Sequence, residues 1–164
     1  MTASPETIIR PAAAADEPAL GRLGAMLVAL HHDFDPDRFI APGPRTEAGY
    51  ASFLAGQIGR NDAVLLVAEH GGAVVGYVFG SLDGTDWMSL RGPAGVVHDL
   101  IVDPDRRGGG IGRRLLEAAL QALRDLGAPR VVLSTAHRNE SAQRLFAAIG
   151  FRPTMIEMTR EWPD

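Results

Sequence analysis

The residues best suited to binding an anion gather in one stretch, LIVDPDRRGGGIGRRLL, from Leu100 to Leu116. Three consecutive glycines, Gly108 to Gly110, let main-chain N–H groups turn toward a ligand without obstruction by Cβ atoms. A helix expected to begin at Ile111 adds unpaired N–H groups and the positive end of its dipole. Together these features predict a phosphate-binding turn.

The charge around this turn supports the same interpretation. Four arginines flank the glycines, although the whole chain carries a formal net charge of −4: Arg106, Arg107, Arg113 and Arg114. A multiply charged phosphate ligand explains a basic stretch in an acidic chain. The Walker pattern is absent, and the chain contains no Lys. A dinucleotide fingerprint fits poorly, because the turn lies two-thirds along the chain and no second nucleotide-binding half follows.

The elements that must position this turn form a mixed α/β arrangement. Hydrophobic patterns predict strands at 7–11, 63–69, 73–82, 96–102 and 131–135, with a final strand or pair of strands at 151–161. Helices are expected after an N-cap at Asp16, from Thr46, at 111–126 and from Asn139 or Ser141 to Ile149, with Gly127 and Gly150 as helix ends. A hairpin followed by a strand–helix–strand unit implies a mixed, mostly antiparallel sheet with flanking helices, in a single domain spanning 1–164.

Composition excludes several function classes. The absence of Cys removes disulfides, thiolate metal sites and a cysteine nucleophile. The net charge disfavours a general nucleic-acid binder. No apolar run approaches the roughly 20 residues of a membrane span, and the first residues do not resemble a secretory signal. We therefore expect a cytoplasmic protein with no nucleic-acid partner and no membrane partner.

Several motifs along the chain resemble one family. Arg107, Gly110 and Gly112 form R-x-x-G-x-G, which is similar to the pyrophosphate-binding motif of the GNAT superfamily of acetyl-CoA-dependent N-acetyltransferases. I-R-P-A at 9–12, V-G-Y at 75–77 and N-x-x-A-x-x-L-F at 139–146 followed by Gly150-Phe151 resemble further parts of that family. The resemblance covers nearly the whole chain, and residues 31–62 are its least diagnostic part.

The resemblance implies a sheet whose fourth and fifth strands splay apart, with acetyl-CoA entering the gap as co-substrate. Backbone groups of Leu100, Ile101 and Val102 would meet the pantetheine arm, and the Val102 N–H would polarise the acetyl carbonyl. The residues expected to hold the pyrophosphate are Arg107, Gly108, Gly109, Gly110, Ile111, Gly112 and Arg113. Asn139 would contact the pantetheine, and Arg144 would approach the nucleotide.

The implied reaction is direct attack of a primary amine on the thioester, without a covalent enzyme intermediate. Two neighbouring candidates exist for the general base, His98 and then Asp99, with a chain of water molecules as an alternative. Many family members place a Tyr acid where this chain has Phe146. N-terminal and ribosomal-protein acetyltransferases usually carry a Glu at the position of Ser134, which argues against that branch.

The acceptor is expected to be a small-molecule amine, with a protein lysine or N-terminus as the alternative. A non-catalytic acyl-CoA-binding or regulatory domain is a rival interpretation, and a homodimer is possible from the family. The loop containing His31, His32 and three aspartates lacks the Gly and Glu of a calcium loop, so no metal is expected. It either attracts a cationic amine or is a solvated loop. Aromatic and Met side chains could line the acceptor site or anchor loops: Phe34, Phe39, Tyr50, Trp87 and Met88.

Overall fold

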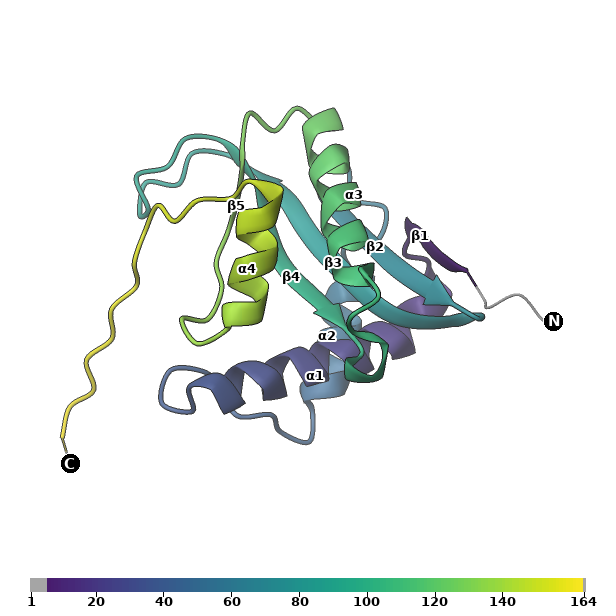
Figure 1. Cartoon of the computed structure of the whole chain (residues 1–164), viewed down its shortest axis with the longest axis horizontal. Coiled ribbons are helices and arrows are strands. Elements are labelled where there is room, and N and C mark those ends of the chain that lie inside the picture. The colour runs from purple at the N-terminus through teal and green to yellow at the C-terminus, as the bar shows by residue number, and fades with distance from the viewer. Residues whose placement is uncertain (1–5, 164) are drawn as a thin grey trace.

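The computed structural model describes residues 6–163 and contains a five-stranded sheet with helices on both faces (Figure 1). The strands are β1 (Thr7–Pro11), β2 (Ala63–His70), β3 (Ala73–Asp83), β4 (Ala94–Val102) and β5 (Val131–Leu133), in that spatial order. Neighbouring pairs from β1 to β4 are antiparallel, whereas β5 runs parallel to β4. The predicted mixed, mostly antiparallel α/β sheet is confirmed.

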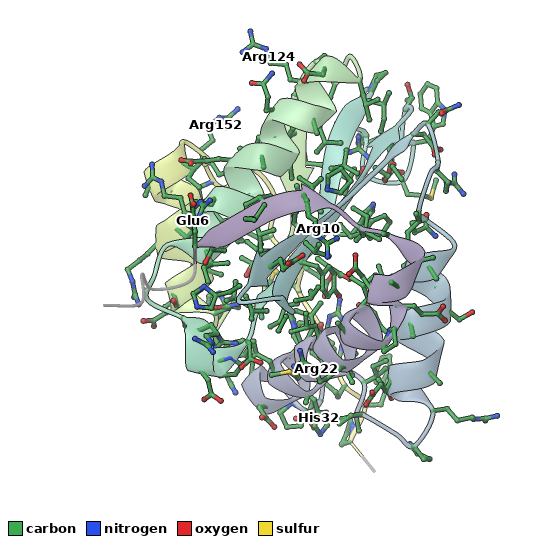
Figure 2. All side chains as sticks on the ribbon, turned by 90° about the vertical axis from the view of Figure 1, so that its right-hand side faces the viewer. Glu6, Arg10, Arg22, His32, Arg124 and Arg152 are labelled. Atoms are coloured by element: carbon green, nitrogen blue, oxygen red, sulfur yellow. The ribbon has the colours of Figure 1, made fainter. Side chains whose placement is uncertain are left out.

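The helices divide between the two faces of the sheet. They are α1 (Glu17–Phe34), α2 (Thr46–Ala55), α3 (Ile111–Asp125) and α4 (Glu140–Ile149), with short 3-10 turns η1 (Ala14–Asp16) and η2 (Pro104–Arg106). Figure 2 looks onto the β1 edge and shows α3 and α4 on one side of the sheet and α1 and α2 on the other. Gly127 and Gly150 both adopt a positive φ after α3 and α4, as helix-ending glycines do.

Two apolar clusters hold the layers together. The α3 side packs Leu115, Leu116 and Leu123 against alternate residues of the sheet such as Val78. On the α1 side, helix residues such as Leu20 pack against the strand side chains that point to the other face, such as Tyr77. On each face of the sheet, helix residues spaced by the 3.6-residue period therefore pack against strand residues spaced by the 2-residue period. Within residues 6–163 no helix combines the length and the apolar character needed to cross a bilayer.

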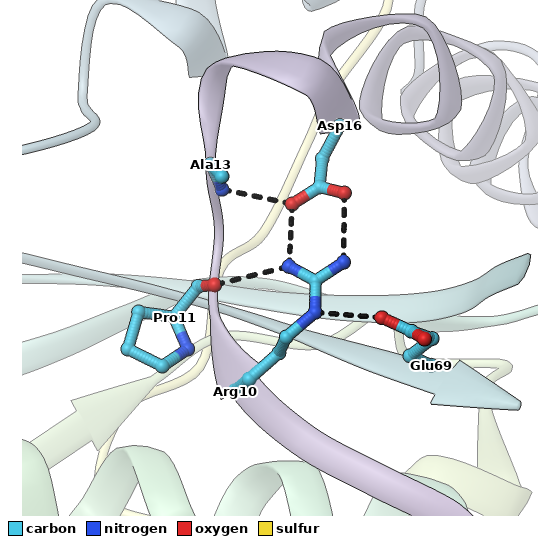
Figure 3. A network of polar contacts seen from close by, with 5 residues as sticks. All are labelled: Arg10, Pro11, Ala13, Asp16 and Glu69. Atoms are coloured by element: carbon cyan, nitrogen blue, oxygen red, sulfur yellow. Dashed lines mark hydrogen bonds and ion pairs between the residues drawn. The ribbon is translucent and has the colours of Figure 1, made fainter. Parts of the chain in front are cut away.

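The start of α1 differs from the predicted capping. Asp16 occupies the N-cap position, but its side chain caps nothing in α1. Its carboxylate instead accepts 2.7 and 2.9 Å bonds from the Arg10 guanidinium and a 2.8 Å bond from Ala13 N–H (Figure 3). Arg10 also donates to Glu69 on β2 at 2.8 Å. The paired guanidinium lowers the pKa of Asp16, and the network joins β1 to the beginning of α1.

The predicted strand or strands at 151–161 are wrong for this structure. Phe151 packs on Phe146, and the chain from residue 152 onward then runs away from the body without joining a ladder (Figure 1). The alternating pattern at 154–162 has no sheet edge beside it in this arrangement. The sheet of the described residues therefore ends at β5.

Candidate active site

A β-bulge in β4 places two ionisable residues side by side. Phe79 faces Asp99 and Gly80 faces Val97, so His98 has no opposite residue in β3. Strict alternation would put 97, 99 and 101 on one face of the sheet. Instead Val97 packs in the α3-side cluster and Ile101 in the α1-side cluster. The extra residue thus lets His98 and Asp99 both face the α1–α2 side, and bulges commonly re-aim side chains in this way.

Asp99 lies partly buried at the floor of this face. The Tyr77 hydroxyl donates to Asp99 Oδ2 at 2.9 Å. Burial raises the pKa of Asp99, although hydrogen bonds from Tyr77 and Tyr50 act in the opposite direction. Burial and the nearby carboxylate in turn raise the pKa of both tyrosines, so these hydroxyls stay protonated. Asp99 is therefore a stronger base than an exposed aspartate.

His98 belongs to a chain of hydrogen bonds that leads away from Asp99. Its ring stacks on Phe79 with centroids 5.1 Å apart. Its Nε2 lies 2.7 Å from Ser81 Oγ, and Ser81 Oγ lies 2.6 Å from Asp83 Oδ1. An ionised Asp83 can only accept, so Ser81 donates to it and accepts from the Nε2–H of His98. This arrangement leaves the Nδ1 atom of a neutral His98 as its proton-accepting nitrogen.

Two hollows meet at the same residues. A hollow of about 310 Å³ is lined mainly by polar and aromatic groups: Tyr50, Phe53, Gln57, Arg60, Asp62, Phe79, Ser81, Asp83, His98 and Asp99. A second hollow of about 200 Å³ is more apolar: Leu27, Val28, His31, Phe39, Ile40, Tyr50, His98 and Asp99. Tyr50, His98 and Asp99 line both. A molecule entering either hollow reaches the two ionisable residues of β4.

The predicted acceptor-side residues divide between this site and the surface. Phe39 and Tyr50 line the hollows, whereas Trp87 and Met88 are 76% and 91% exposed and line neither. His31 and His32 bond to the carbonyl oxygens of Leu27 and Phe39. In the part of the chain that the structure describes, no three side chains of His, Asp or Glu come together as a metal would require.

The glycine-rich turn lies on the opposite face, at the start of α3. Gly108 and Gly110 adopt φ of +86° and +76°, a conformation that favours glycine. A Cβ built on Gly108, Gly109 or Gly110 meets no other atom within 4 Å. The first helical hydrogen bond runs from Arg114 N–H to the Gly110 carbonyl, so the N–H groups of residues 111–113 precede the helical ladder. The turn thus offers open space beside unsatisfied donors.

The flanking arginines are less available than the sequence suggests. Arg107 Nε donates to the Val102 carbonyl at 3.1 Å, and Arg113 Nε pairs with Glu117 at 2.8 Å. Arg114 reaches the Thr7 carbonyl on β1 at 2.9 Å and points away from the turn. Three of the four flanking arginines thus have other partners, and the N–H groups of residues 111–113 lie beside the open space of the turn.

The edge of β4 that faces away from β3 is open beside the turn. Asp103 N–H donates to the Val75 carbonyl at 2.8 Å, so by alternation Ile101 faces β3 while Leu100 and Val102 direct their main-chain groups outward. β5 accompanies β4 only at Gly95–Val97. In the described chain, the outward groups of Leu100 and the Val102 N–H lie beyond the end of β5, where an extended ligand could add like a strand, whereas Arg107 occupies the Val102 carbonyl.

Three residues that the sequence analysis singled out lie in α4 or at its N-cap. Asn139 caps the helix through a 3.2 Å bond from Ala142 N–H to its Oδ1. Arg144 is exposed and lies 3.7 Å from Glu140. Phe146 packs on Phe151 with ring centroids 6.0 Å apart. No hydroxyl group is therefore supplied by residue 146, and the tyrosine hydroxyls of the site belong to the other face.

The sequence offered Tyr50 as a possible acceptor-site residue but did not place Tyr77, Ser81 or Asp83 at the site. The signal for these three was present in strand parity, because Tyr77, Ser81 and Asp83 alternate with Phe79 along β3 and therefore share a face. Aligning Phe79 with Asp99 would have brought this row beside the β4 candidates. The register needed for that alignment depends on the bulge, which no local motif marks.

The comparison with protein families settles the classification. The model described as the acetyltransferase (GNAT) family matches residues 27–151. The chain belongs to this family. The membership predicted from the R-x-x-G-x-G turn is therefore confirmed, and so is the predicted GNAT-type fold.

Two curated GNAT relatives resemble part of the chain. A mycothiol acetyltransferase of Thermobispora bispora is 38% identical over 100 residues, which cover 58% of this chain and 32% of that protein. The L-amino acid N-acyltransferase MnaT of Escherichia coli is 36% identical over 89 residues, covering 53% of this chain and 49% of that protein. The chain matches half or less of the length of either relative.

A solved structure extends the likeness over the whole fold. Aminoglycoside N-acetyltransferase AAC(6')-Iy in complex with CoA aligns with a TM-score of 0.75 at 15% identity, covering 99% of this chain and 98% of that one. At this identity the likeness establishes the GNAT fold alone. The fold of that neighbour accommodates CoA.

Proposed function

We propose that residues 1–164 form a single N-acetyltransferase domain that transfers acetyl from acetyl-CoA to a primary amine of a small molecule by direct attack in a ternary complex. One observation carries this proposal. The bulge in β4 sets Asp99 and His98 on a hollow, and farther along the same strand the outward main-chain groups of Leu100 and the Val102 N–H lie beyond the end of β5. Two reactants could therefore meet along one strand.

The residues on the α3 side fit acetyl-CoA. The open turn of Gly108, Gly109 and Gly110 and the N–H groups of Ile111, Gly112 and Arg113 are suited to a pyrophosphate. Leu100 and Val102 would hold the pantetheine arm, with Asn139 beside it and Arg144 toward the nucleotide. When bound, acetyl-CoA supplies an activated acetyl thioester. The Val102 N–H is the donor proposed for the acetyl oxygen.

Asp99 is the proposed general base. Its raised pKa increases its proton affinity, and Tyr77 fixes one carboxylate oxygen, so the other can face an ammonium group. His98 is the second candidate, because its Nδ1 can accept a proton while Nε2 donates toward Ser81 and Asp83. The two residues line the same hollows, so each can affect the protonation of an amine bound there.

No side-chain acid is assigned to the leaving thiolate. Phe146 cannot donate a proton, and a thiol with an ordinary pKa of about 8.5 leaves tolerably as the thiolate. Holding both reactants together supplies much of the rate acceleration in such a reaction. The proposed mechanism therefore needs a base and a binding site more than it needs an acid.

A small amine is the proposed acceptor. A hollow of about 310 Å³ lies at the lower end of the range of small-molecule sites. Two relatives carry names that refer to mycothiol and to L-amino acids, which supports small acceptors. Asp83 on the wall suits a cationic molecule, whereas Asp62 is paired with Arg60 at 2.8 Å. A cytoplasmic location stays a prediction from the sequence.

The deciding experiment measures amine-dependent release of CoA thiol. Because the chain has no Cys, a thiol reagent reports only the product. We expect release with members of a small-amine panel, and thermal stabilisation by acetyl-CoA but not by ATP. Release with peptides alone would instead favour a protein acetyltransferase. Stabilisation without release from any amine or peptide would favour an acyl-CoA-binding domain.

A further inference from the structure

Two hollows of different character open from one junction on the α1–α2 side of the sheet. The junction consists of the three residues that line both hollows, Tyr50, His98 and Asp99. The proposed base, Asp99, is therefore within reach of a molecule in either hollow. A primary amine that meets this base at the junction can extend one group into each hollow at the same time.

The smaller hollow, of about 200 Å³, has apolar walls beyond the junction. Its apolar residues come from α1 and from the loop that follows: Leu27, Val28, Phe39 and Ile40. The remaining residue, His31, has its Nδ1 atom 2.9 Å from the Leu27 carbonyl oxygen and its ring edge against Phe39. A cavity of about 150 Å³ with such walls can hold a benzene ring. The smaller hollow thus suits an apolar group up to the size of a phenyl ring.

The larger hollow, of about 310 Å³, has charged walls beyond the junction: Arg60, Asp62 and Asp83. Arg60 and Asp62 pair with each other through two hydrogen bonds, from Nε to Oδ1 at 2.9 Å and from Nη2 to Oδ2 at 2.8 Å. Asp83 instead accepts a 2.6 Å bond from the uncharged Ser81 hydroxyl, which does not neutralise its charge. This hollow therefore favours a group that donates hydrogen bonds and disfavours a second carboxylate.

We propose that the acceptor is a primary amine on a branched carbon, which bears an apolar group for the smaller hollow and a hydrogen-bond-donating arm without a carboxylate for the larger one. This inference rests on the function proposed above and names the class of acceptor. Amino alcohols are simple members of the class, whereas a free amino acid would bring its carboxylate toward Asp83 and Asp99. A carbon that bears the amine, two different arms and a hydrogen is a stereocentre. Because the two hollows differ, only one enantiomer puts each arm in its own hollow.

The first test compares four related amines by kcat/KM for release of CoA thiol at saturating acetyl-CoA. Phenylalaninol carries both arms, ethanolamine lacks the apolar group, phenethylamine lacks the polar arm, and phenylalanine has a carboxylate in place of that arm. We expect phenylalaninol to exceed each single-arm amine by about 10-fold or more, since each loses one set of contacts. Phenylalaninol should exceed phenylalanine by at least about 10-fold because of the like charges. One enantiomer of phenylalaninol should react several-fold faster than the other.

The outcomes of this comparison separate the inference from the function on which it rests. Equal kcat/KM for phenylalaninol and the single-arm amines overturns the inference alone. A preference for phenylalanine over phenylalaninol, or equal rates for the two enantiomers, does the same. Thiol release from none of the four amines also overturns the inference. Only silence across the whole amine and peptide panel described above extends that failure to the proposed function.

A second test identifies the hollow that holds the apolar group. Val28→Phe should fill the smaller hollow and bring the ratio of kcat/KM for phenylalaninol to that for ethanolamine toward one. Ile40→Trp should move the ratio in the same direction, and Ile40 is 78% exposed, so this variant can still fold. The matched control, Gln121→Phe on the exposed surface of α3, should leave the ratio unchanged. An unmoved ratio in both Val28→Phe and Ile40→Trp overturns the assignment of the smaller hollow.

A third test addresses the charge of the larger hollow. Asp83→Asn should raise the ratio of kcat/KM for phenylalanine to that for phenylalaninol several-fold, because it removes a like charge. The control, Asp125→Asn on the exposed surface of α3, should leave this ratio unchanged. Both amines meet the same base, so an indirect effect of Asp83 through His98 lowers both rates and cancels in the ratio. A ratio that stays constant in Asp83→Asn overturns the assignment of the larger hollow.

Discussion

The Tyr77 hydroxyl on β3 donates a 2.9 Å hydrogen bond to Asp99 Oδ2 on β4. Asp99 faces Phe79 in the ladder and Tyr77 faces Ile101, so the bond runs diagonally across the two strands. Tyr77 is fully buried and is held by the core of the α1 side. The candidate base is thus fixed by a side chain of the hydrophobic core.

Tyr77→Phe should therefore change the pH dependence of catalysis. The hydroxyl stabilises the ionised carboxylate, so its loss raises the pKa of Asp99 further. The acidic limb of the kcat/KM profile should shift to higher pH, and the free energy of unfolding should fall by about 1–3 kcal/mol. Tyr50→Phe should shift the limb in the same direction, and Gln121→Ala on the surface of α3 should not. An unmoved limb in Tyr77→Phe would exclude Asp99 as the base.

Asp99→Asn should lower the activity but raise the stability of the protein. Loss of the base should lower kcat by about 10²- to 10⁴-fold. The folded pKa is raised above the unfolded value, so the fold loses stability as the pH rises above the unfolded pKa, and the loss is complete above the folded pKa. The variant should gain thermal stability at neutral pH, with the gain vanishing below about pH 4.

A matched control for that prediction is Asp86→Asn. Bonds from Ser89 and from the N–H groups of Met88 and Ser89 lower the pKa of Asp86, so its ionised form stabilises the fold at neutral pH. This variant should lose stability where Asp99→Asn gains it. Melting temperatures of the two variants across the pH range test the opposite signs. Equal signs at neutral pH would contradict the assignment of Asp99 as a buried, destabilising carboxylate.

Substitutions of the glycines in the turn should separate effects on folding from effects on cofactor binding. Gly109 has no positive φ, and a Cβ there meets open space. Gly109→Ala should therefore preserve the melting temperature while raising KM for acetyl-CoA, because the methyl group enters the ligand's space. Gly110→Ala should additionally cost about 1–2 kcal/mol of stability, since its φ is +76°. An unchanged KM in Gly109→Ala would remove the turn from the pyrophosphate site.

Gly80 should be essential to the strand pair that carries the bulge. A Cβ on Gly80 would lie 2.8 Å from the Val96 carbonyl oxygen and 3.4 Å from Leu123 Cδ1. Gly80→Ala should destabilise the fold by about 1–3 kcal/mol in chemical unfolding. Gly49→Ala in α2, where the added methyl meets nothing within 4 Å, should instead stabilise by about 0.5–1 kcal/mol. A neutral Gly80→Ala would mean that β3 and β4 can move apart there.

Much of the fold could be predicted because its signals are local. Apolar residues at helical spacing, such as Ile111, Leu115 and Leu116, specify α3. Gly127 follows the helix in a left-handed backbone conformation that other residues avoid. The hairpin around Gly71-Gly72 follows from two apolar strands and a tight turn. The turn at 108–110 was visible for the same reason, since glycines and a helix start suffice to describe it.

The remainder depended on contacts between distant residues. Asp16 has the type and position of an N-cap, but Arg10 and Ala13 N–H take up its oxygens. Residues 154–162 have a strand pattern, but no sheet edge lies beside them in this structure. The partners of Asp99 required the register of β3 against β4, which a one-residue bulge alters without any mark in the local sequence.

The extra residue in β4 also determines how the candidate site and the core share one strand. Val97 and Asp99 already lie on opposite faces, as neighbours in an ordinary pleat would. Excising His98 would leave a regular strand in which no other side chain has to cross the sheet. His98 thus gives the face a second ionisable group while Val97 and Ile101 keep their core positions.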